Sequence, residues 1–285
     1  MWFLLIVLAF VSITIETQAQ YSAGAKQISL SNSDVALSND VFSLFNNPAG
    51  LSQMNWRELG IYYSPSPFGL SELANGYVAF NEPFKFGSIG IGAMTYGFEL
   101  YRENKFTVGY SYNHINKLFV GAVINLHTVS IKNYGDDNIF YLNAGGLFYL
   151  QRDLRLGFSV QNINRASFGS EKDNVPLIFN LGVSYDVLEE FIFNLGLEKD
   201  IRYNYSVRGG IEYNLFDYIS LRTGFSNEPS RYSAGIGINY SYFSLDYAFF
   251  THQDLGLTHQ AGLIISFDSE GNRNDRIRKH LQISN

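Results

Sequence analysis

The sequence contains no cysteine among its 285 residues, so it can form neither disulfides nor a lipid-modified N-terminal cysteine. Charged residues are also scarce, at 16% of the chain, and there are only 6 prolines. After residue 19, no apolar run reaches the length of about 20 residues that a membrane-spanning helix needs. If this chain crosses a membrane, it crosses with strands.

The first 19 residues differ in composition from the rest of the chain. Residues 2–15 are almost wholly apolar, and Ala19 supplies the small residue that a signal peptidase requires. This run is short for a spanning helix of about 20 residues. We therefore interpret residues 1–19 as a secretory signal peptide, and an uncleaved anchor is the alternative.

From residue 58 to residue 267 the sequence alternates with a period of two. In 105–113, 154–161 and 232–240, large apolar residues occupy every second position, and Gly, Ser, amide or charged residues occupy the others. The span predicts fourteen strands, with about fifteen residues for each strand and its connection. Their expected starts are Glu58, Glu72, Phe86, Lys105, Lys117, Ile139, Leu154, Leu177, Phe191, Tyr205, Tyr218, Tyr232, Phe243 and Thr258.

The connections between these strands alternate in length. Short turns are expected after even-numbered strands and longer loops after odd-numbered ones, including 65–71, 97–104, 130–137 and 163–174. Such alternation is typical of outer-membrane barrels whose two termini are periplasmic. The last outward residues of the even strands should form an aromatic girdle at the bilayer interface. These residues are Tyr112, Phe148, Tyr185, Tyr213, Tyr240 and Phe267.

A soluble sandwich or propeller would show the same alternation. Those folds bury the apolar face and expose a second face that is usually rich in Lys and Glu. Here the second face is mostly Gly, Ser and Asn. We therefore predict an all-β fold, a 14-stranded antiparallel transmembrane barrel over residues 56–267, in the bacterial outer membrane and surrounded by its lipid.

A fourteen-stranded barrel is too wide for its own side chains to fill, and narrower than open porins of about sixteen to eighteen strands. Segment 20–55 is of suitable size to act as a plug, and we expect it to enter from the periplasm. Pro48 fixes its own φ and biases Asn47 toward extended backbone, while Gly50 permits a turn. Residues 46–51 thus form a rigid corner before the first strand. The candidate plug and ligand residues are Asn46, Asn47, Pro48 and Gly50.

Alternation also places charged and amide side chains on the inner face of the barrel. They form either a polar path with a ligand headgroup site or mutually neutralising pairs that hold the plug. The similar number of positive and negative residues favours the pairs. The candidate lumen-lining residues are Arg155, Asn180, Asp186, Arg208, Glu212, Arg222 and Asp246.

No group of residues indicates catalysis, and we predict no enzyme activity, cofactor or metal. The five histidines are scattered, and His252 and His259, which flank one loop, lack further ligands in the sequence around them. The Gly-Ile-Gly strings at 90–92 and 235–237 lie within strands and precede no helix, so they are small lumen residues rather than phosphate loops. The net charge of −6 argues against nucleic-acid binding.

The segment ahead of the strands resembles a known family. Residues 24–26 (Gly-Ala-Lys), 34–37 (Asp-Val-Ala-Leu), 39–41 (Asn-Asp-Val) and 47–51 (Asn-Pro-Ala-Gly-Leu), followed by the β series, resemble the FadL-like outer-membrane barrels and, within them, the PorV/PorQ branch. The resemblance implies fourteen strands and an N-terminal plug. Resemblance to FadL itself implies uptake of long-chain fatty acids or other hydrophobic compounds, which leave sideways through the barrel wall. Resemblance to PorV and PorQ implies an accessory role in type IX secretion, with secretion-system proteins or exported cargo as partners.

The sequence departs from this family in three respects. Residues 31–33 (Ser-Asn-Ser) replace an expected glycine pair, the short loops leave little room for a cargo platform, and a polar tail, 268–285, follows the last strand. We expect this tail to be disordered or to contact a periplasmic partner. The leading hypothesis is passage or capture of a small hydrophobic compound, and the alternative is the secretion role.

Overall fold

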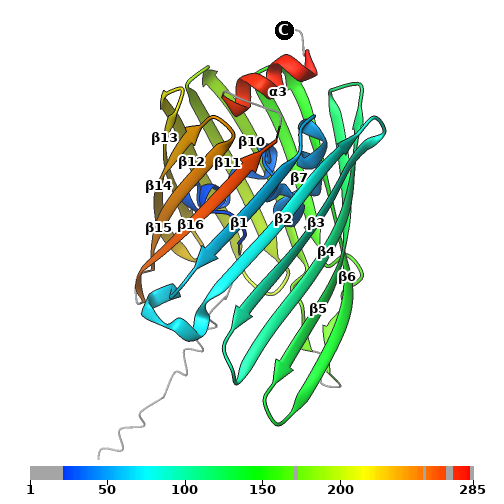
Figure 1. The fold of residues 1–285 in the computed structure, drawn as a ribbon. Helices are drawn as coiled ribbons and strands as arrows, with labels where there is room; N and C mark the ends of the chain where they lie inside the picture. The colour runs from blue at the N-terminus through cyan, green and yellow to red at the C-terminus, as the bar shows by residue number, and fades with distance from the viewer. Residues whose placement is uncertain (1–21, 170–172, 253–254, 268–271, 283–285) are drawn as a thin grey trace, which may run out of the picture.

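The structure is a computed structural model that describes residues 22–169, 173–252, 255–267 and 272–282. The predicted signal peptide lies outside these residues. Within the described ranges, fourteen strands pair antiparallel and close into a barrel, in which β1 lies beside β16 (Figure 1). The predicted all-β class and the fourteen-stranded antiparallel barrel are confirmed.

The barrel wall follows the chain order, with each strand beside its neighbours in sequence. Its strands are β1 (Glu58–Ser64), β2 (Asn75–Phe84), β3 (Gly87–Gly97), β4 (Tyr101–His114), β5 (Leu118–Ile131), β6 (Gly135–Gln151), β7 (Leu154–Gln161), β10 (Ile178–Leu188), β11 (Phe191–Asp200), β12 (Tyr205–Phe216), β13 (Ile219–Asn227), β14 (Ser230–Tyr240), β15 (Phe243–His252) and β16 (Gly256–Ser266). A small sheet, formed by β8 (Ser167–Phe168) and β9 (Asp173–Asn174), lies in the connection between β7 and β10. The predicted starts of β1, β7, β11, β12 and β15 coincide with the observed ones. The other starts differ. A period-two pattern shows which face of the sheet each side chain points to, but it does not define the residue at which a strand begins.

The outer face of the barrel is apolar, as a membrane wall requires. Phe106, Leu181 and Leu195 are each more than half exposed. The aromatic residues predicted at the ends of the even strands are exposed as well, which confirms that they point outward. They are Tyr112, Phe148, Tyr185, Tyr213, Tyr240 and Phe267.

The two ends of the barrel differ, and we call them the turn rim and the loop rim. The turn rim carries short connections such as 85–86 and 152–153, whereas the loop rim carries 65–74 and 162–177. The loops expected at 97–104 and 130–137 are largely absent, because β4, β5 and β6 continue in register; Ile131, for example, pairs with Gly135. β-Branched residues such as Thr128 and Val129 favour this extended backbone.

Residues 22–54, called the luminal segment below, lie inside the barrel against its inner wall (Figure 1). Four short helices follow one another within it: α1 (Ala25–Ser29), η1 (Asp34–Ala36), α2 (Ser43–Asn46) and η2 (Pro48–Gln53). α1 contacts β13 to β16, η1 contacts β7, β10 and β11, and η2 contacts β3 to β6. The segment therefore runs around the interior and contacts most of the wall.

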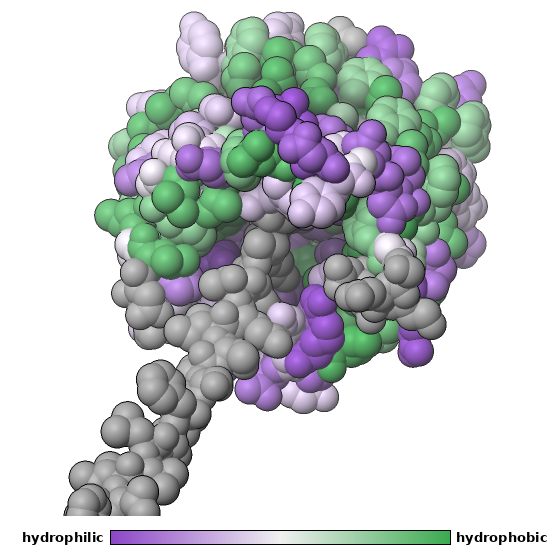
Figure 2. All heavy atoms as spheres, turned by 90° about the horizontal axis from the view of Figure 1, so that it is seen from below, coloured by the Kyte–Doolittle hydropathy of each residue, from purple (hydrophilic) through white to green (hydrophobic). Residues whose placement is uncertain are grey.

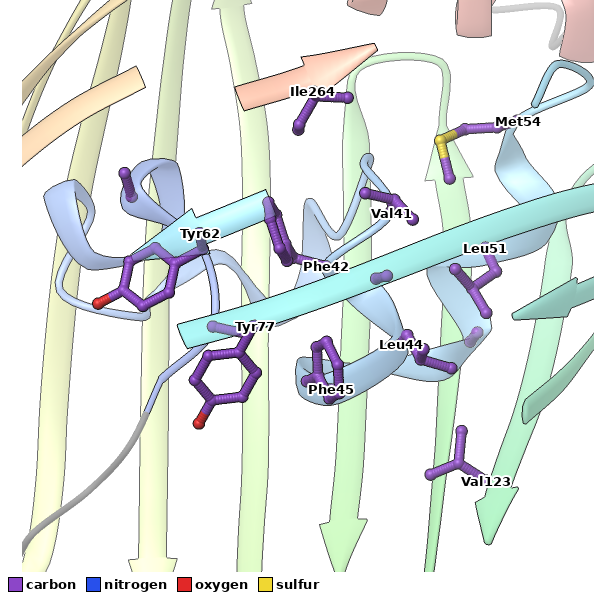
Figure 3. Close-up of a cluster of buried hydrophobic side chains, with 14 of the residues drawn as sticks. Val41, Phe42, Leu44, Phe45, Leu51, Met54, Tyr62, Tyr77, Val123 and Ile264 are labelled. Atoms are coloured by element: carbon purple, nitrogen blue, oxygen red, sulfur yellow. The ribbon is translucent and has the colours of Figure 1, made fainter. Parts of the chain in front are cut away.

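Apolar side chains fix the luminal segment beside β1, β2 and β3. The ring of Phe42 lies edge-on to that of Tyr62, with 6.5 Å between centroids, and Phe45 lies edge-on to Tyr77 at 5.0 Å. Leu44 is fully buried in the same cluster (Figure 3). Burying a side chain of this size stabilises the fold by about 1.5–3 kcal/mol relative to exposing it.

The wall meets the luminal segment with inward-facing glycines, which we call the glycine belt. A Cβ at Gly121 would lie 2.5 Å from the carbonyl carbon of Pro48, and one at Gly224 would lie 2.5 Å from that of Leu30. The two backbones thus touch directly, and only glycine allows so close an approach. The belt consists of Gly60, Gly90, Gly92, Gly109, Gly121, Gly145, Gly157, Gly182, Gly196, Gly210, Gly224, Gly235 and Gly262.

The expectation of disorder in the polar tail is wrong for α3 (Arg273–Leu281), which lies over the turn rim (Figure 1). Asn272 caps this helix by accepting a hydrogen bond from the N–H of Asn274. Ile277 and Leu281, four residues apart, form its buried apolar side. Such a short helix has too little apolar periodicity to be recognised in sequence. None of the helices in the described part of the chain has the length and apolar character needed to cross a bilayer.

Replacing Gly121 with Ala should loosen the luminal segment from the wall. The new methyl group would lie 2.5 Å from the Pro48 carbonyl carbon, so the backbone has to move, and overpacking of this kind costs about 1–3 kcal/mol. We expect a lower midpoint of urea unfolding in lipid vesicles and faster amide exchange in η2. Gly262→Ala is the matched control, because its methyl group would meet its nearest neighbours at 3.6 Å. Equal midpoints for the two variants would contradict the close fit.

Candidate functional site

The half of the lumen nearer the loop rim is lined by aromatic side chains. Tyr62 and Tyr77 face inward from paired positions on β1 and β2, and their ring centroids lie 5.7 Å apart. The Phe68 and Phe250 rings meet edge-on at 5.8 Å. Seen from this end, the surface is hollowed, and both hydrophobic and hydrophilic residues surround the hollow (Figure 2). Tyr62, Tyr77 and Phe250 are buried in one apolar cluster, and Phe68 packs against it inside the mouth of the barrel.

Loop 65–74 closes part of this mouth and contains η3 (Pro67–Gly69) and η4 (Ser71–Leu73). Pairing between β1 and β16 stops at Ala261, and η3 packs beside the remaining edge of β16. There the N–H of Phe68 donates to Thr258 Oγ1 at 3.0 Å. Phe68 adopts a φ of 57°, a strained conformation for a residue other than glycine. The loop thus covers a strand edge that would otherwise be unpaired.

A polar cavity of about 80 Å³ lies next to the luminal segment. The Lys105 ammonium group at this cavity lies 5.5 Å from the ring centroid of Phe45 and 5.8 Å from that of Tyr77, a cation–π arrangement. Among the described residues, the Tyr77 hydroxyl has no hydrogen-bond partner. Burial raises the pKa of the Asp34 carboxyl, which also lines the cavity, to about 6, and the nearby Asp40 charge adds to the rise. The amides that line the cavity are Asn32, Asn46, Asn125, Asn143, Gln161 and Asn180.

The described chain begins at this cavity. Ser22 lines it, and the carbonyl of Ala23 accepts a hydrogen bond from Asn46 Nδ2 at 3.3 Å. The cavity wall is built from residues such as Lys105 and Arg208, near the loop-rim starts of β4 and β12. Ser22, the first described residue of the luminal segment, therefore lies on the loop-rim side of the interior. The predicted entry from the periplasm concerns residues before Ser22, which lie outside the described ranges.

The predicted corner at residues 46–51 joins the luminal segment to the wall. Asn47 Nδ2 donates to the carbonyl of Val35 at 2.8 Å and to that of Gly146 at 3.2 Å, while its Oδ1 accepts from the N–H of Ala49 at 3.3 Å. The backbone of Asn47 is extended, with φ −144°, before Pro48 begins η2. A Cβ at Gly50 would lie 2.0 Å from the Ser38 carbonyl oxygen, so no other residue fits there. Of the four predicted residues, only Asn46 lines the cavity.

Ion pairs fill the half of the lumen nearer the turn rim. Arg222 lies between two carboxylates, with its Nε 2.6 Å from Glu212 Oε2 and its Nη1 bonded to Asp246. Lys26 of the luminal segment approaches Glu212 at 3.9 Å. We call these four side chains the ion belt; all of them are buried.

The other predicted lumen residues are also inside the barrel. Arg155 pairs with Asp186, and Arg208 pairs with Glu198. Asn180 lines the polar cavity. Because every predicted charge has a partner of opposite sign, the distances favour neutralising pairs over a charged headgroup site. Within the described ranges, no three His, Asp or Glu side chains gather closely enough to hold a metal ion.

Sequence reasoning did not single out Glu58, Tyr62, Tyr77 and Lys105. The period-two pattern places all four on the inner face, so part of the signal was available. Which inward residues meet at one cavity depends on strand register and on the path of the luminal segment. Neither can be read from the pattern of a single strand.

No protein-family model matches the sequence, and no curated protein matches it. Solved structures share its fold. The CymD monoaromatic hydrocarbon channel superposes with a TM-score of 0.66 at 13% identity, over 87% of this chain and 98% of that one. A Pseudomonas aeruginosa FadL homologue superposes with a TM-score of 0.60 at 11% identity, over 87% of this chain and 97% of that one. The P. putida toluene transporter TodX superposes with a TM-score of 0.58 at 13% identity, over 80% of this chain and 92% of that one.

The fold is thus that of FadL-type outer-membrane channels. Two of these neighbours are a channel and a transporter, and the third is a FadL homologue. They give no support to the PorV/PorQ branch, so that assignment and the secretion-system partners stay predictions.

Replacing Arg222 with Met should strongly destabilise the barrel. Asp246 would lose its buried counter-charge and Glu212 would keep only Lys26, and breaking a buried pair costs about 3–5 kcal/mol. Urea unfolding in vesicles measures this loss. Adding Asp246→Asn should recover most of it, because it removes the carboxylate left without a counter-charge and keeps the Lys26–Glu212 pair neutral. Arg57→Met removes an exposed pair with Glu82 and is the control, with an expected cost of at most about 1 kcal/mol. Similar losses for Arg57→Met and Arg222→Met would rule out this role of the ion belt.

Proposed function

We propose that this chain is an outer-membrane channel that admits small hydrophobic compounds. The observation that carries the proposal is the aromatic lining at the loop rim, formed by Tyr62, Tyr77, Phe68 and Phe250. It occurs in a barrel with the fold of CymD, a monoaromatic hydrocarbon channel, and TodX, a toluene transporter. Transfer of an apolar solute from water to such an aromatic environment is favourable.

In this proposal the luminal segment is the plug of the channel. The contacts of η2 with β3 to β6 and of α1 with β13 to β16 support this role, because they span the interior. The solute would meet the aromatic lining first and the polar cavity beside Lys105 next. The plug and the ion belt then close the direct path to the turn rim.

The proposal also orients the channel in the membrane. The turn rim faces the periplasm and the loop rim faces outward, because short turns are typical of the periplasmic end of outer-membrane barrels. α3 then lies on the periplasmic side. The exposed apolar wall between the rims contacts outer-membrane lipid.

Cells that produce this protein should take up radiolabelled toluene faster than cells with an empty vector. Tyr62→Asp should reduce that uptake by about tenfold, because a carboxylate in the apolar lining disfavours a hydrocarbon by an energy of this order. Tyr62→Phe keeps the ring and is the matched control, with uptake close to that of the unmodified protein. Barrel levels are compared by heat-dependent mobility on gels. Uptake no faster than in vector cells would refute the proposal.

A further inference from the structure

The C-terminal helix α3 is bound to the luminal segment by its first turn. Arg273 Nη1 donates to the carbonyl of Asn39 at 3.1 Å and forms an ion pair with Glu58, the first residue of β1. Asn274 Oδ1 accepts a hydrogen bond from Asn39 Nδ2 at 2.6 Å. Glu58 is fully buried and also accepts from the N–H of Val41 at 3.1 Å. The start of α3 therefore joins the luminal segment to the first strand.

The second half of α3 is bound to the opposite part of the wall. Arg278 Nη2 donates to Asp186 Oδ2 on β10 at 2.7 Å, and Asp186 also pairs with Arg155 on β7. Between these two ends of the helix, the Arg276 guanidinium lies 4.2 Å from the ring centroid of Trp56, two residues before β1. The helix thus extends across the turn rim from β1 to β10.

A small polar chamber of about 30 Å³ lies under α3. Its floor includes Lys26 and Asp40 of the luminal segment, and its sides include the ion-belt residues Glu212, Arg222 and Asp246. Asn272, Arg273 and Asn274 complete its lining. The start of α3 therefore forms one wall of this chamber at the turn rim.

We propose that α3 is a latch that closes this chamber and holds the luminal segment in place. A helix of nine residues is not stable by itself in water, so its structure depends on docking. The docking contacts are mostly hydrogen bonds and ion pairs, which water can replace when the helix leaves. Release of α3 frees Asn39, leaves the Glu58 carboxylate without Arg273 and opens the chamber to the periplasmic side. This inference does not depend on which compound the channel admits.

Thiol accessibility tests the latch, because the chain has no native cysteine. Ser244→Cys places a thiol in the lining of the chamber. Its rate of reaction with a charged methanethiosulfonate reagent is measured in vesicles, with the reagent on the turn-rim side. Adding Arg273→Ala, Asn274→Ala and Arg278→Ala should raise the rate by about tenfold or more, because a protected site reacts in proportion to its open population.

Two controls accompany this measurement. Lys279→Ala alters an exposed residue on the same helix and should leave the rate of Ser244→Cys unchanged. Lys117→Cys is exposed in a turn at the same rim and should react equally fast with α3 docked or released. A protease site inserted after Phe267 allows α3 to be cut off and washed away after the barrel has folded, in case the triple variant fails to fold.

Two results would overturn the proposal. If Ser244→Cys reacts as fast as Lys117→Cys in the docked protein, α3 does not close the chamber. If removal of α3 leaves the Ser244→Cys rate unchanged, α3 is not the latch. Toluene uptake measured in parallel is a separate readout, so failure of the latch is distinguishable from failure of the proposed channel function.

Discussion

Direct contact between the backbone of the luminal segment and the glycine belt is the constraint on which the rest of this structure depends. Fourteen strands enclose more space than the wall side chains can fill. The chain fills that space with its own residues 22–54 and omits side chains from the wall where the two backbones meet, as at Gly121 and Pro48. The ion belt and the corner at Asn47 can form only because this contact fixes the segment.

The luminal segment divides the interior into two parts of different chemistry. Toward the loop rim, buried rings such as Tyr62 and Phe250 form an apolar cluster beside the polar cavity at Lys105. Toward the turn rim, Arg222 and its partners make up a charged layer whose members neutralise one another. In the proposed channel, an apolar solute would be stabilised in the first part and excluded by the second. Passage straight through the barrel is therefore opposed by the wall's own charges as well as by the bulk of the segment.

Much of the barrel could be predicted from sequence because period-two alternation is local. It identified the strands and the outward position of residues such as Tyr112. Features that depend on distant pairing could not be predicted. The cavity beside Lys105 requires several strands and the luminal segment to meet, and the long β5–β6 hairpin shows that polar residues such as Asp136 and Asp137 can continue a strand. α3 was missed because its docking partners, Asn39 and Glu58, lie more than 200 positions away.

The pairing of β1 with β16 has a consequence for assembly. Glu58 lies opposite Ser266, so the wall cannot close until the last strand has been made. The luminal segment precedes the first strand and contacts strands along most of the wall, up to the last one, β16. Its contacts with the wall can therefore be completed only after the final strands have formed. In this chain the earliest part of the fold to be synthesised is among the last to reach its full set of contacts.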